Sequence, residues 1–314
     1  MKNETLIIGS RGSDLALWQA NWTRSALAEH HPELDIEITI VQTKGDQITD
    51  VDLSKVGGKG LFTKALEDKL LDGSIDIAVH SLKDLPTELP TGLEISAVTI
   101  REDPRDAFVS TGHIRFKDLP EKARVATGSL RRKSQLLNRR PDLQIQPLRG
   151  NVPTRLEKLR NSDWHGIVLA KAGLKRLELL DDSTEILDWD VMLPAVGQGA
   201  LGIETREEDF QVNAILAPIN DADTEAGTRA ERALLRKLEG GCQVPIGAHG
   251  YVDNGRLYLQ AYVGTLDGSH AVRGAIDGSP DDAGKLGIRL AEQLLGRGAD
   301  GILESVREAE RQND

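Results

Sequence analysis

Cysteine, aromatic residues and long apolar runs are all scarce in this chain of 314 residues. Because Cys242 is the only cysteine, an internal disulfide and a metal site built from several cysteines are excluded, which leaves burial or reactivity as the role of that thiol. Before Arg11 the only apolar run is Leu6 to Ile8, and no later stretch approaches membrane-spanning length. We therefore expect no signal peptide and predict a cytoplasmic protein.

The composition also limits the class of ligand. Aromatic residues make up 4% of the chain and form no interleaved stacking platform of the kind that binds single-stranded nucleic acid. A formal net charge of -11 argues against general affinity for nucleic acids or anionic membranes. Residues 124–176 reverse this balance, with 13 Lys and Arg against three acids, Asp142, Glu157 and Asp163. We expect a small polyanionic ligand there.

Short apolar runs alternate with helical patterns through the first two thirds of the chain, which is typical of an α/β fold. Ser13 is the expected N-cap of one helix, and Gly73 is the expected end of another over Leu61 to Leu71. At this length we expect two or three domains. The expected strands are 5–9, 36–41, 75–79, 95–99, 124–126, 145–148, 167–170 and 201–205.

Two hinge-like stretches predict that the chain crosses between two lobes around a cleft. They are residues 101–105, centred on Asp103-Pro104, and residues 193–200, which read LPAVGQGA. The predicted domains are therefore 1–100 with 200–218, then 101–199, then 219–314.

The last third has a different pattern. Turn signals at Asn254-Gly255 and Asp267-Gly268 separate alternating strands such as Arg256 to Val263, which predicts an antiparallel meander. Helices are expected after it, over 280–295 and 302–311.

Polar and basic residues follow several of the expected strands, at the edge where open α/β sheets bind their ligands. Arg11 and Ser13 lie in the loop after the first strand, and the loop from Thr127 to Arg132 repeats this arrangement in the second lobe. An ordinary capped turn explains either loop alone, and a solvated basic face is the usual explanation of clustered charge. Two such loops facing one cleft favour an anion site, and Arg149, Arg155 and Arg176 follow later strands.

Three further features suggest chemistry. The segment IDIAVHSLKDLPTELP places His80, Ser81, Lys83 and Asp84 directly after an apolar strand. The segment KVGGKGLF, from Lys55 to Phe62, is glycine-rich but lacks the spacing of a phosphate-binding loop, so we interpret it as a lid with cationic ends. The segment EGGCQVPIG favours an accessible thiol over a buried one.

Taken together, these segments resemble the porphobilinogen deaminases, also called hydroxymethylbilane synthases. The resemblance spans nearly the whole chain and includes IGSRGSDLALWQA, VGGKGLFTKALE, DIAVHSLKDLPTELP, REDPRDAF, TGSLRRKSQL, RGNVPTRLEKL, GIVLAKAGLKRL, LPAVGQGALGIE and ERALLRKLEGGCQVPIGA. It implies an α/β fold of three domains, of which the first two resemble the lobes of type II periplasmic binding proteins and the third is a small α/β domain with an antiparallel sheet.

The resemblance also implies a transferase of heme and porphyrin biosynthesis that acts as a monomer and needs no metal. Its cofactor is a dipyrromethane held through a thioether to Cys242. Porphobilinogen loses ammonia to give an azafulvenium cation, which the free α-carbon of this primer attacks. Four such cycles followed by hydrolysis release hydroxymethylbilane and leave the dipyrromethane in place.

Residue roles follow from the matching motifs alone. Asp84 matches the catalytic aspartate, which stabilises the cationic species. Besides Cys242, the implied cofactor contacts are Lys83, Arg131, Arg132, Ser129, Thr127 and Ser81. The implied substrate contacts are Arg11, Ser13, Arg149, Arg155, Arg176 and Lys55, with Lys59 and Phe62 in the loop over the site.

Two other interpretations remain open at this point. A two-lobed binding module that only captures an anion explains the lobes and hinges but gives the thiol no role. A nucleic-acid-binding regulator that uses residues 124–176 predicts an affinity that falls steeply with salt. Neither accounts for Asp84 together with Cys242.

Overall fold

The computed structural model describes residues 5–43, 63–181, 184–238 and 244–311. The chain forms two compact units. Unit 1 comprises Met1–Glu102 with Gly199–Glu225, and unit 2 comprises Asp103–Gln198 with Ala226–Asp314. No helix among the described residues is long and apolar enough to cross a membrane.

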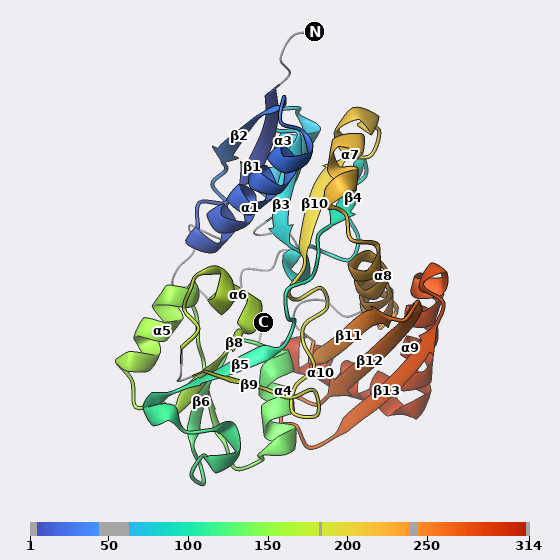
Figure 1. The fold of residues 1–314 in the computed structure, drawn as a ribbon. Helices are drawn as coiled ribbons and strands as arrows, with labels where there is room; N and C mark the ends of the chain where they lie inside the picture. The colour runs from blue at the N-terminus through green and yellow to red at the C-terminus, as the bar shows by residue number, and fades with distance from the viewer. Residues whose placement is uncertain (1–4, 44–62, 182–183, 239–243, 312–314) are drawn as a thin grey trace. The chain divides into compact units, whose positions relative to one another are not determined.

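Unit 1 is built on a five-stranded sheet of order β2-β1-β3-β10-β4. Strands β1, β2 and β3 are parallel, and β10 runs antiparallel to both of its neighbours. Figure 1 shows β1, β3 and β10 side by side within this unit. The strands are β1 (Thr5–Ser10), β2 (Asp35–Ile40), β3 (Ile77–Ser81), β4 (Leu93–Val98) and β10 (Leu201–Arg206).

Helices cover both faces of this sheet because its strands alternate apolar side chains between them. On one face Ile77 and Val79 pack with Leu27 of α1 (Asp14–His30). On the other face Ala78 packs with Leu66 and Leu70 of α3 (Lys64–Leu71). Among the described residues, the other helices of the unit are η1 (Leu82–Asp84), α7 (Phe210–Leu216) and η4 (Ala217–Ile219), and α8 (Ala222–Lys237) begins here and continues into unit 2.

The first sheet of unit 2 repeats the topology of unit 1. Its order is β7-β6-β8-β5-β9, with β6 parallel to β7 and β8, and with β5 antiparallel to both of its neighbours. Two α/β lobes of matching topology confirm this part of the predicted fold class. The strands are β5 (Asp106–Ser110), β6 (Arg124–Ala126), β7 (Gln144–Gln146), β8 (Gly166–Ala170) and β9 (Thr184–Ile186), and the helices are η2 (Thr111–His113), η3 (Phe116–Asp118), α4 (Leu130–Arg139), α5 (Val152–Arg160) and α6 (Lys171–Arg176).

The second sheet of unit 2 is the predicted antiparallel meander, of order β11-β12-β13. Asp253 pairs with Arg256, so Asn254 and Gly255 form a two-residue hairpin loop. Both have positive φ, of 50° and 72°, as a type I′ turn requires. The elements are β11 (Ile246–Asp253), β12 (Arg256–Gly264), β13 (Ala271–Gly278), η5 (Pro280–Asp282), α9 (Ala283–Leu294), the π-turn η6 (Leu295–Ala299) and α10 (Asp300–Arg311).

The strands β5 and β9 were not among the predicted ones. Strand β9 has three residues and lies at the sheet edge. Every residue of β5 is buried, and its short apolar run follows directly on the hinge-like Asp103-Pro104 segment. The position of β5 inside the sheet, between β8 and β9, is therefore visible only in the fold.

In unit 2, polar contacts join α4, which follows β6 of the first sheet, to the second sheet and its β12–β13 loop. The Ser134 Oγ of α4 lies 2.8 Å from the Tyr262 hydroxyl of β12, and Asn138 donates to the Gly268 carbonyl at 2.9 Å. These contacts group residues 103–198 with the C-terminal sheet. The division into three domains, with its predicted boundaries, stays a prediction.

Helix α8 and strand β11 approach so closely that both carry glycine at the contact. A Cβ atom on Gly227 would lie 2.6 Å from the Gly250 carbonyl oxygen, which is part of the sheet backbone and cannot move aside. We expect Gly227→Ala to lower the free energy of unfolding by about 1–3 kcal/mol through overpacking, as measured by urea denaturation.

The matched control is Gly284→Ala in α9, where a new Cβ would meet no atom within 4 Å. It should instead stabilise the protein by about 0.5–1 kcal/mol, because alanine loses less backbone entropy in a helix. Equal effects of the two substitutions would contradict the steric explanation.

Candidate functional site

In unit 1 the predicted site residues lie at the carboxyl edge of the sheet. Strands β1 and β3 are parallel neighbours, so the residues that follow them meet at one edge. Arg11 and Ser13 follow β1, and the Ser13 hydroxyl caps α1 by accepting from the Ala16 amide at 3.4 Å. The Gln19 side chain of α1 donates to the Ser81 hydroxyl at 2.7 Å and so connects α1 to the end of β3.

Asp84 stands on a firmly held turn. It ends η1, in which Leu82 is 1% exposed and packs with Leu85 and Ala200. The Leu82 amide donates to the Ala200 carbonyl at 3.0 Å, and the Leu85 amide donates to the Leu82 carbonyl at 3.2 Å. The backbone below Asp84 is thus buried, whereas the residue itself is exposed. This places a carboxylate at the surface of the edge on a rigid base.

The carboxyl edge of the first sheet in unit 2 gathers a second set of predicted residues. Thr127 and Ser129 lie between β6 and α4, where the Ser129 hydroxyl caps the helix by accepting from the Arg132 amide at 3.4 Å. A Cβ on Gly128 would lie 2.4 Å from the Leu148 carbonyl oxygen, so this loop packs closely against the segment after β7. Arg149 is in that segment, Arg155 is in α5 and Arg176 ends α6, and all three are half-buried.

Arg131 and Arg132 are held inside the unit by one carboxylate. Arg131 Nη1 donates to Asp106 Oδ2 at 2.6 Å and to the Leu193 carbonyl at 2.7 Å. Arg132 Nη2 donates to Asp106 Oδ1 at 2.7 Å, and its Nη1 donates to the Val168 carbonyl at 2.8 Å. The two arginines are each 5% exposed and Asp106 is fully buried. Both predicted cofactor contacts therefore also have a structural role.

The cluster of Asp106, Arg131 and Arg132 has a net positive charge. Burial by itself raises the pKa of Asp106, but the charges of Arg131 and Arg132 outweigh burial and hold that pKa well below its ordinary value. Burial also lowers the pKa of Arg131, and the negative charge of Asp106 acts in the opposite direction. Two cations thus share one anion. Arg131 Nε is a buried donor that has no hydrogen-bond partner among the described residues.

Other charges of the basic segment 124–176 are neutralised by acids outside it. Lys171 pairs with Asp103 at 2.6 Å, and Arg139 pairs with Asp190 at 2.9 Å. These partners are distant in sequence, so counting charges within the segment overstates what a ligand has to neutralise. The arginines at the sheet edge remain the stronger candidates for anion binding.

Four predicted residues, Lys55, Lys59, Phe62 and Cys242, lie outside the described residues. In the part of the chain that the structure describes, no three His, Cys, Asp or Glu side chains are grouped as a metal site.

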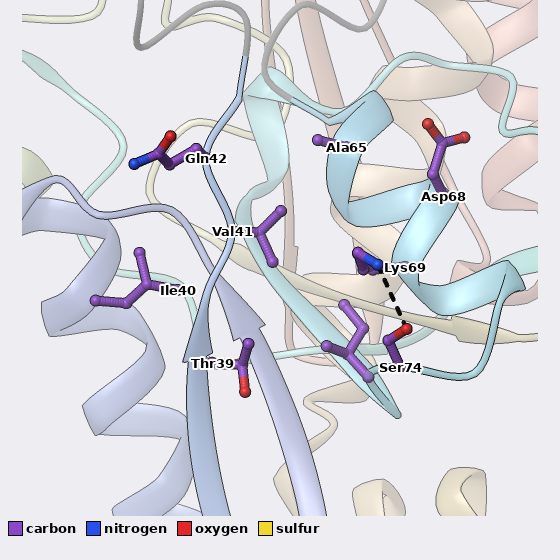
Figure 2. Close-up of a pocket in the computed structure, with 9 residues that line it drawn as sticks. Thr39, Ile40, Val41, Gln42, Ala65, Asp68, Lys69 and Ser74 are labelled. Carbon is purple, nitrogen blue, oxygen red and sulfur yellow. Dashed lines mark hydrogen bonds between the residues drawn. The ribbon is translucent and has the colours of Figure 1, made fainter.

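The structure also contains a pocket that the sequence did not suggest. It has a volume of about 540 Å³ and lies between the end of β2 and helix α3 (Figure 2). None of the predicted site residues contributes to its wall. Its lining residues are Thr39, Ile40, Val41, Gln42, Ala65, Asp68, Lys69, Ser74 and Ile75.

Sequence reasoning missed two residues that organise the polar edges. Gln19 lies within an ordinary helical pattern, and nothing in that pattern indicates a side chain 2% exposed and bonded to Ser81. Asp106 lies within the motif REDPRDAF, but it was assigned no role from the sequence. The available signal was a charged residue directly before the apolar run Ala107 to Val109, where an acid in a strand needs a partner.

Comparison with known families gives two matches that together cover most of the chain. The model described as porphobilinogen deaminase, dipyromethane cofactor binding domain, matches residues 6–214. The model described as porphobilinogen deaminase, C-terminal domain, matches residues 227–296.

Curated relatives match over nearly their full length, and each is named porphobilinogen deaminase. The protein of Carboxydothermus hydrogenoformans is 52% identical over 307 residues, which are 98% of each chain. That of Chlorobaculum tepidum is 53% identical over 310 residues, covering 98% of this chain and 99% of the relative. Among solved structures, an amino-acid ABC transporter extracellular-binding protein from Bacillus subtilis is 12% identical, with a TM-score of 0.42 over 69% of this chain and 90% of that chain.

The buried Asp106 cluster yields a stability prediction. Asp106→Asn would leave two buried guanidinium groups without their anion, and we expect it to lower the free energy of unfolding by about 3–5 kcal/mol at neutral pH. The pKa of Asp106 is lower in the folded protein, so its stabilisation is present above the ordinary pKa and is lost as pH falls through the folded value. The difference between wild type and variant in urea denaturation should therefore shrink in acid.

Asp163→Asn is the matched control, because Asp163 pairs with Arg124 on the surface and both are largely exposed. Its effect should stay within about 1 kcal/mol. If Asp106→Asn has as small an effect at neutral pH, the proposed dependence of unit 2 on this carboxylate is wrong.

Proposed function

Because this chain belongs to the porphobilinogen deaminase family, we propose that it joins four porphobilinogen molecules head to tail, with loss of ammonia, and releases hydroxymethylbilane by hydrolysis. In this proposal the protein is a transferase of tetrapyrrole synthesis and acts in the cytoplasm as a monomer. The observation that carries the proposal is that the match covers 98% of both this chain and a relative of that name.

The residues present fit a dipyrromethane cofactor. A dipyrromethane with acetate and propionate groups needs cationic and N–H donors. The Asp106 cluster has an excess positive charge, and its buried donor Arg131 Nε has no hydrogen-bond partner in the part of the chain that the structure describes. Linked to Cys242, the cofactor supplies the pyrrole α-carbon to which the first substrate is joined. The residues that we propose to hold it are Lys83, Ser81, Thr127, Ser129, Arg131 and Arg132.

Asp84 is the proposed catalytic residue. When the C–N bond of porphobilinogen breaks, ammonia leaves with the electron pair and the methylene carbon becomes cationic. A carboxylate fixed beside that position stabilises the cation and accepts a hydrogen bond from a pyrrole N–H. The pyrrole α-carbon then attacks this cation to form a new C–C bond, and the proton that the attacking carbon loses balances the proton that leaves with ammonia. The rigid turn under Asp84 supports this role, because a preorganised charge needs no rearrangement during the reaction.

Arginines at the two polar edges are proposed to bind the substrate carboxylates. Each added pyrrole brings an acetate and a propionate, and the planar guanidinium group binds carboxylates through two parallel hydrogen bonds. The proposed contacts are Arg11, Ser13, Arg149, Arg155, Arg176, Lys55, Lys59 and Phe62.

Intact mass under denaturing conditions tests the covalent cofactor directly. We expect the purified protein to exceed its sequence mass by two linked pyrroles, and Cys242→Ser to lack this excess because it has no thiolate to form the thioether. A protein with only its sequence mass, which gains nothing on incubation with porphobilinogen, would instead support the module that captures an anion without catalysis.

Turnover of Asp84→Ala tests the catalytic carboxylate. We expect the variant to carry the cofactor in full, by intact mass, while kcat falls on the order of 100-fold or more, because the developing cation loses its stabilising charge. Glu29→Gln is the control, since Glu29 is an exposed carboxylate near the far end of α1. Near-normal turnover of Asp84→Ala would exclude the proposed role.

A further inference from the structure

Beneath the polar edge of unit 1 lies a buried ionisable pair that the proposed chemistry does not use. His80 of β3 is 5% exposed, and its Nε2 lies 3.0 Å from Oε2 of Glu204 in β10, which is fully buried. The other oxygen of this carboxylate, Oε1, is buried and has no hydrogen-bond partner among the described residues. A carboxylate in this environment depends on His80.

Strand register brings the two side chains together. Strands β3 and β10 are antiparallel, with Ala78 opposite Glu204 and His80 opposite Gly202. His80 and Glu204 are therefore diagonal neighbours on one face of the sheet, the face that α3 covers. A Cβ on Gly202 would lie 2.9 Å from the side chain of Leu82, so glycine at this position makes room for Leu82 of η1.

A second carboxylate approaches the pair from α3. Glu67 is 6% exposed, and burial raises its pKa, with the negative charge of Glu204 raising it further. His80 acts in the opposite direction. The other groups that act on Glu67 are the hydroxyl of Thr63 and the carboxylate of Asp68.

Stability alone is a poor explanation of this cluster. Removing charged groups from water costs several kcal/mol per ion, and apolar side chains of similar volume often serve a fold as well or better. The surrounding face has such side chains, at Leu66, Leu70 and Ala78. A specific contact that fixes one strand against another is a better-supported use of a buried polar pair.

The pair sits directly before the turn that carries Asp84. Ser81 ends β3 immediately after His80, and η1 follows with Asp84 at its end. On the main chain, the Leu82 amide donates to the carbonyl of Ala200, the residue directly before β10, and so ties that turn to the start of this strand. The His80–Glu204 contact is thus a side-chain tie between the two strands within four residues of the carboxylate.

We propose that His80 is a positioning residue for Asp84, and that its buried contact with Glu204 fixes the carboxyl end of β3 so that the Asp84 carboxylate is held where positive charge develops. This inference rests on the proposed catalytic role of Asp84. It assigns to His80 no contact with substrate or cofactor.

The test compares His80→Leu with His80→Gln in the full-length protein carrying its cofactor. Leucine removes the contact and keeps the volume, whereas the glutamine amide is a donor that still reaches toward Glu204. We expect His80→Leu to remain fully loaded by intact mass and to keep KM for porphobilinogen within twofold. Its kcat should fall at least 10-fold, and the amides of residues 81–85 should exchange with deuterium at least 10-fold faster. His80→Gln should recover kcat to within threefold of wild type.

The matched control is His31→Gln. His31 is a partly buried histidine of the same unit, at the carboxyl end of α1 and away from Asp84. Its Nε2 lies 3.0 Å from the carbonyl oxygen of Ile215. This variant should keep kcat, KM and the exchange rates of residues 81–85. An equal loss of kcat in both histidine variants would reduce His80 to a general structural role and overturn the proposal.

Asp84→Asn, assayed alongside, separates the two hypotheses. If Asp84→Asn is inactive while His80→Leu keeps kcat within twofold, only the positioning role fails. If Asp84→Asn turns over normally, the catalytic assignment fails and the positioning role fails with it. If His80→Leu does not fold, Glu204→Gln takes its place, because the glutamine keeps an acceptor for His80 without the charge. Wild-type kcat and unchanged deuterium exchange of residues 81–85, in both His80→Gln and Glu204→Gln, would support the hydrogen-bonded contact as the element that positions Asp84. A 10-fold loss in His80→Gln contradicts it.

Discussion

The buried carboxylate of Asp106 holds several segments of unit 2 together through hydrogen bonds. It begins β5, accepts from Arg131 and Arg132 of α4, and accepts from Gln198 at 3.1 Å. Through the same arginines it is linked to the carbonyls of Val168 in β8 and Leu193. One buried anion thus connects the central strand, the helix after β6 and the crossing segment 193–198, and the basic residues at the sheet edge depend on that arrangement.

Both lobes use the same solution to place polar groups. In each sheet parallel strands end at one edge, and the loops that follow them carry hydroxyl, basic and acidic side chains. Hydrogen bonds hold these loops in place, from Gln19 to Ser81 in unit 1 and from the Arg132 amide to Ser129 in unit 2. The chain can therefore present rigid donors from segments that are far apart in sequence.

Buried charge adjoins the polar edge in each unit. In unit 2 it is the Asp106 cluster, next to Ser129 in the chain, and in unit 1 it is the His80–Glu204 pair, next to Ser81. Replacing a buried ion pair by apolar side chains of similar volume often leaves a protein as stable or makes it more stable. Both the Asp106 cluster and the His80–Glu204 pair lie beside residues of the proposed site, and a buried polar contact of this kind fixes geometry more specifically than an apolar contact does.

Local pattern was enough for the α/β class, the Ser13 cap, the Asn254-Gly255 turn and the residues that follow each strand, because these depend on neighbours in sequence. The same patterns named the candidate arginines and Asp84. Tertiary structure alone decided that β5 and β10 lie antiparallel inside their sheets, that Arg131 and Arg132 share Asp106, and that His80 meets Glu204. Each of these facts joins residues distant in sequence, and whether a charge faces solvent, a ligand or a buried partner depends on which strands become neighbours.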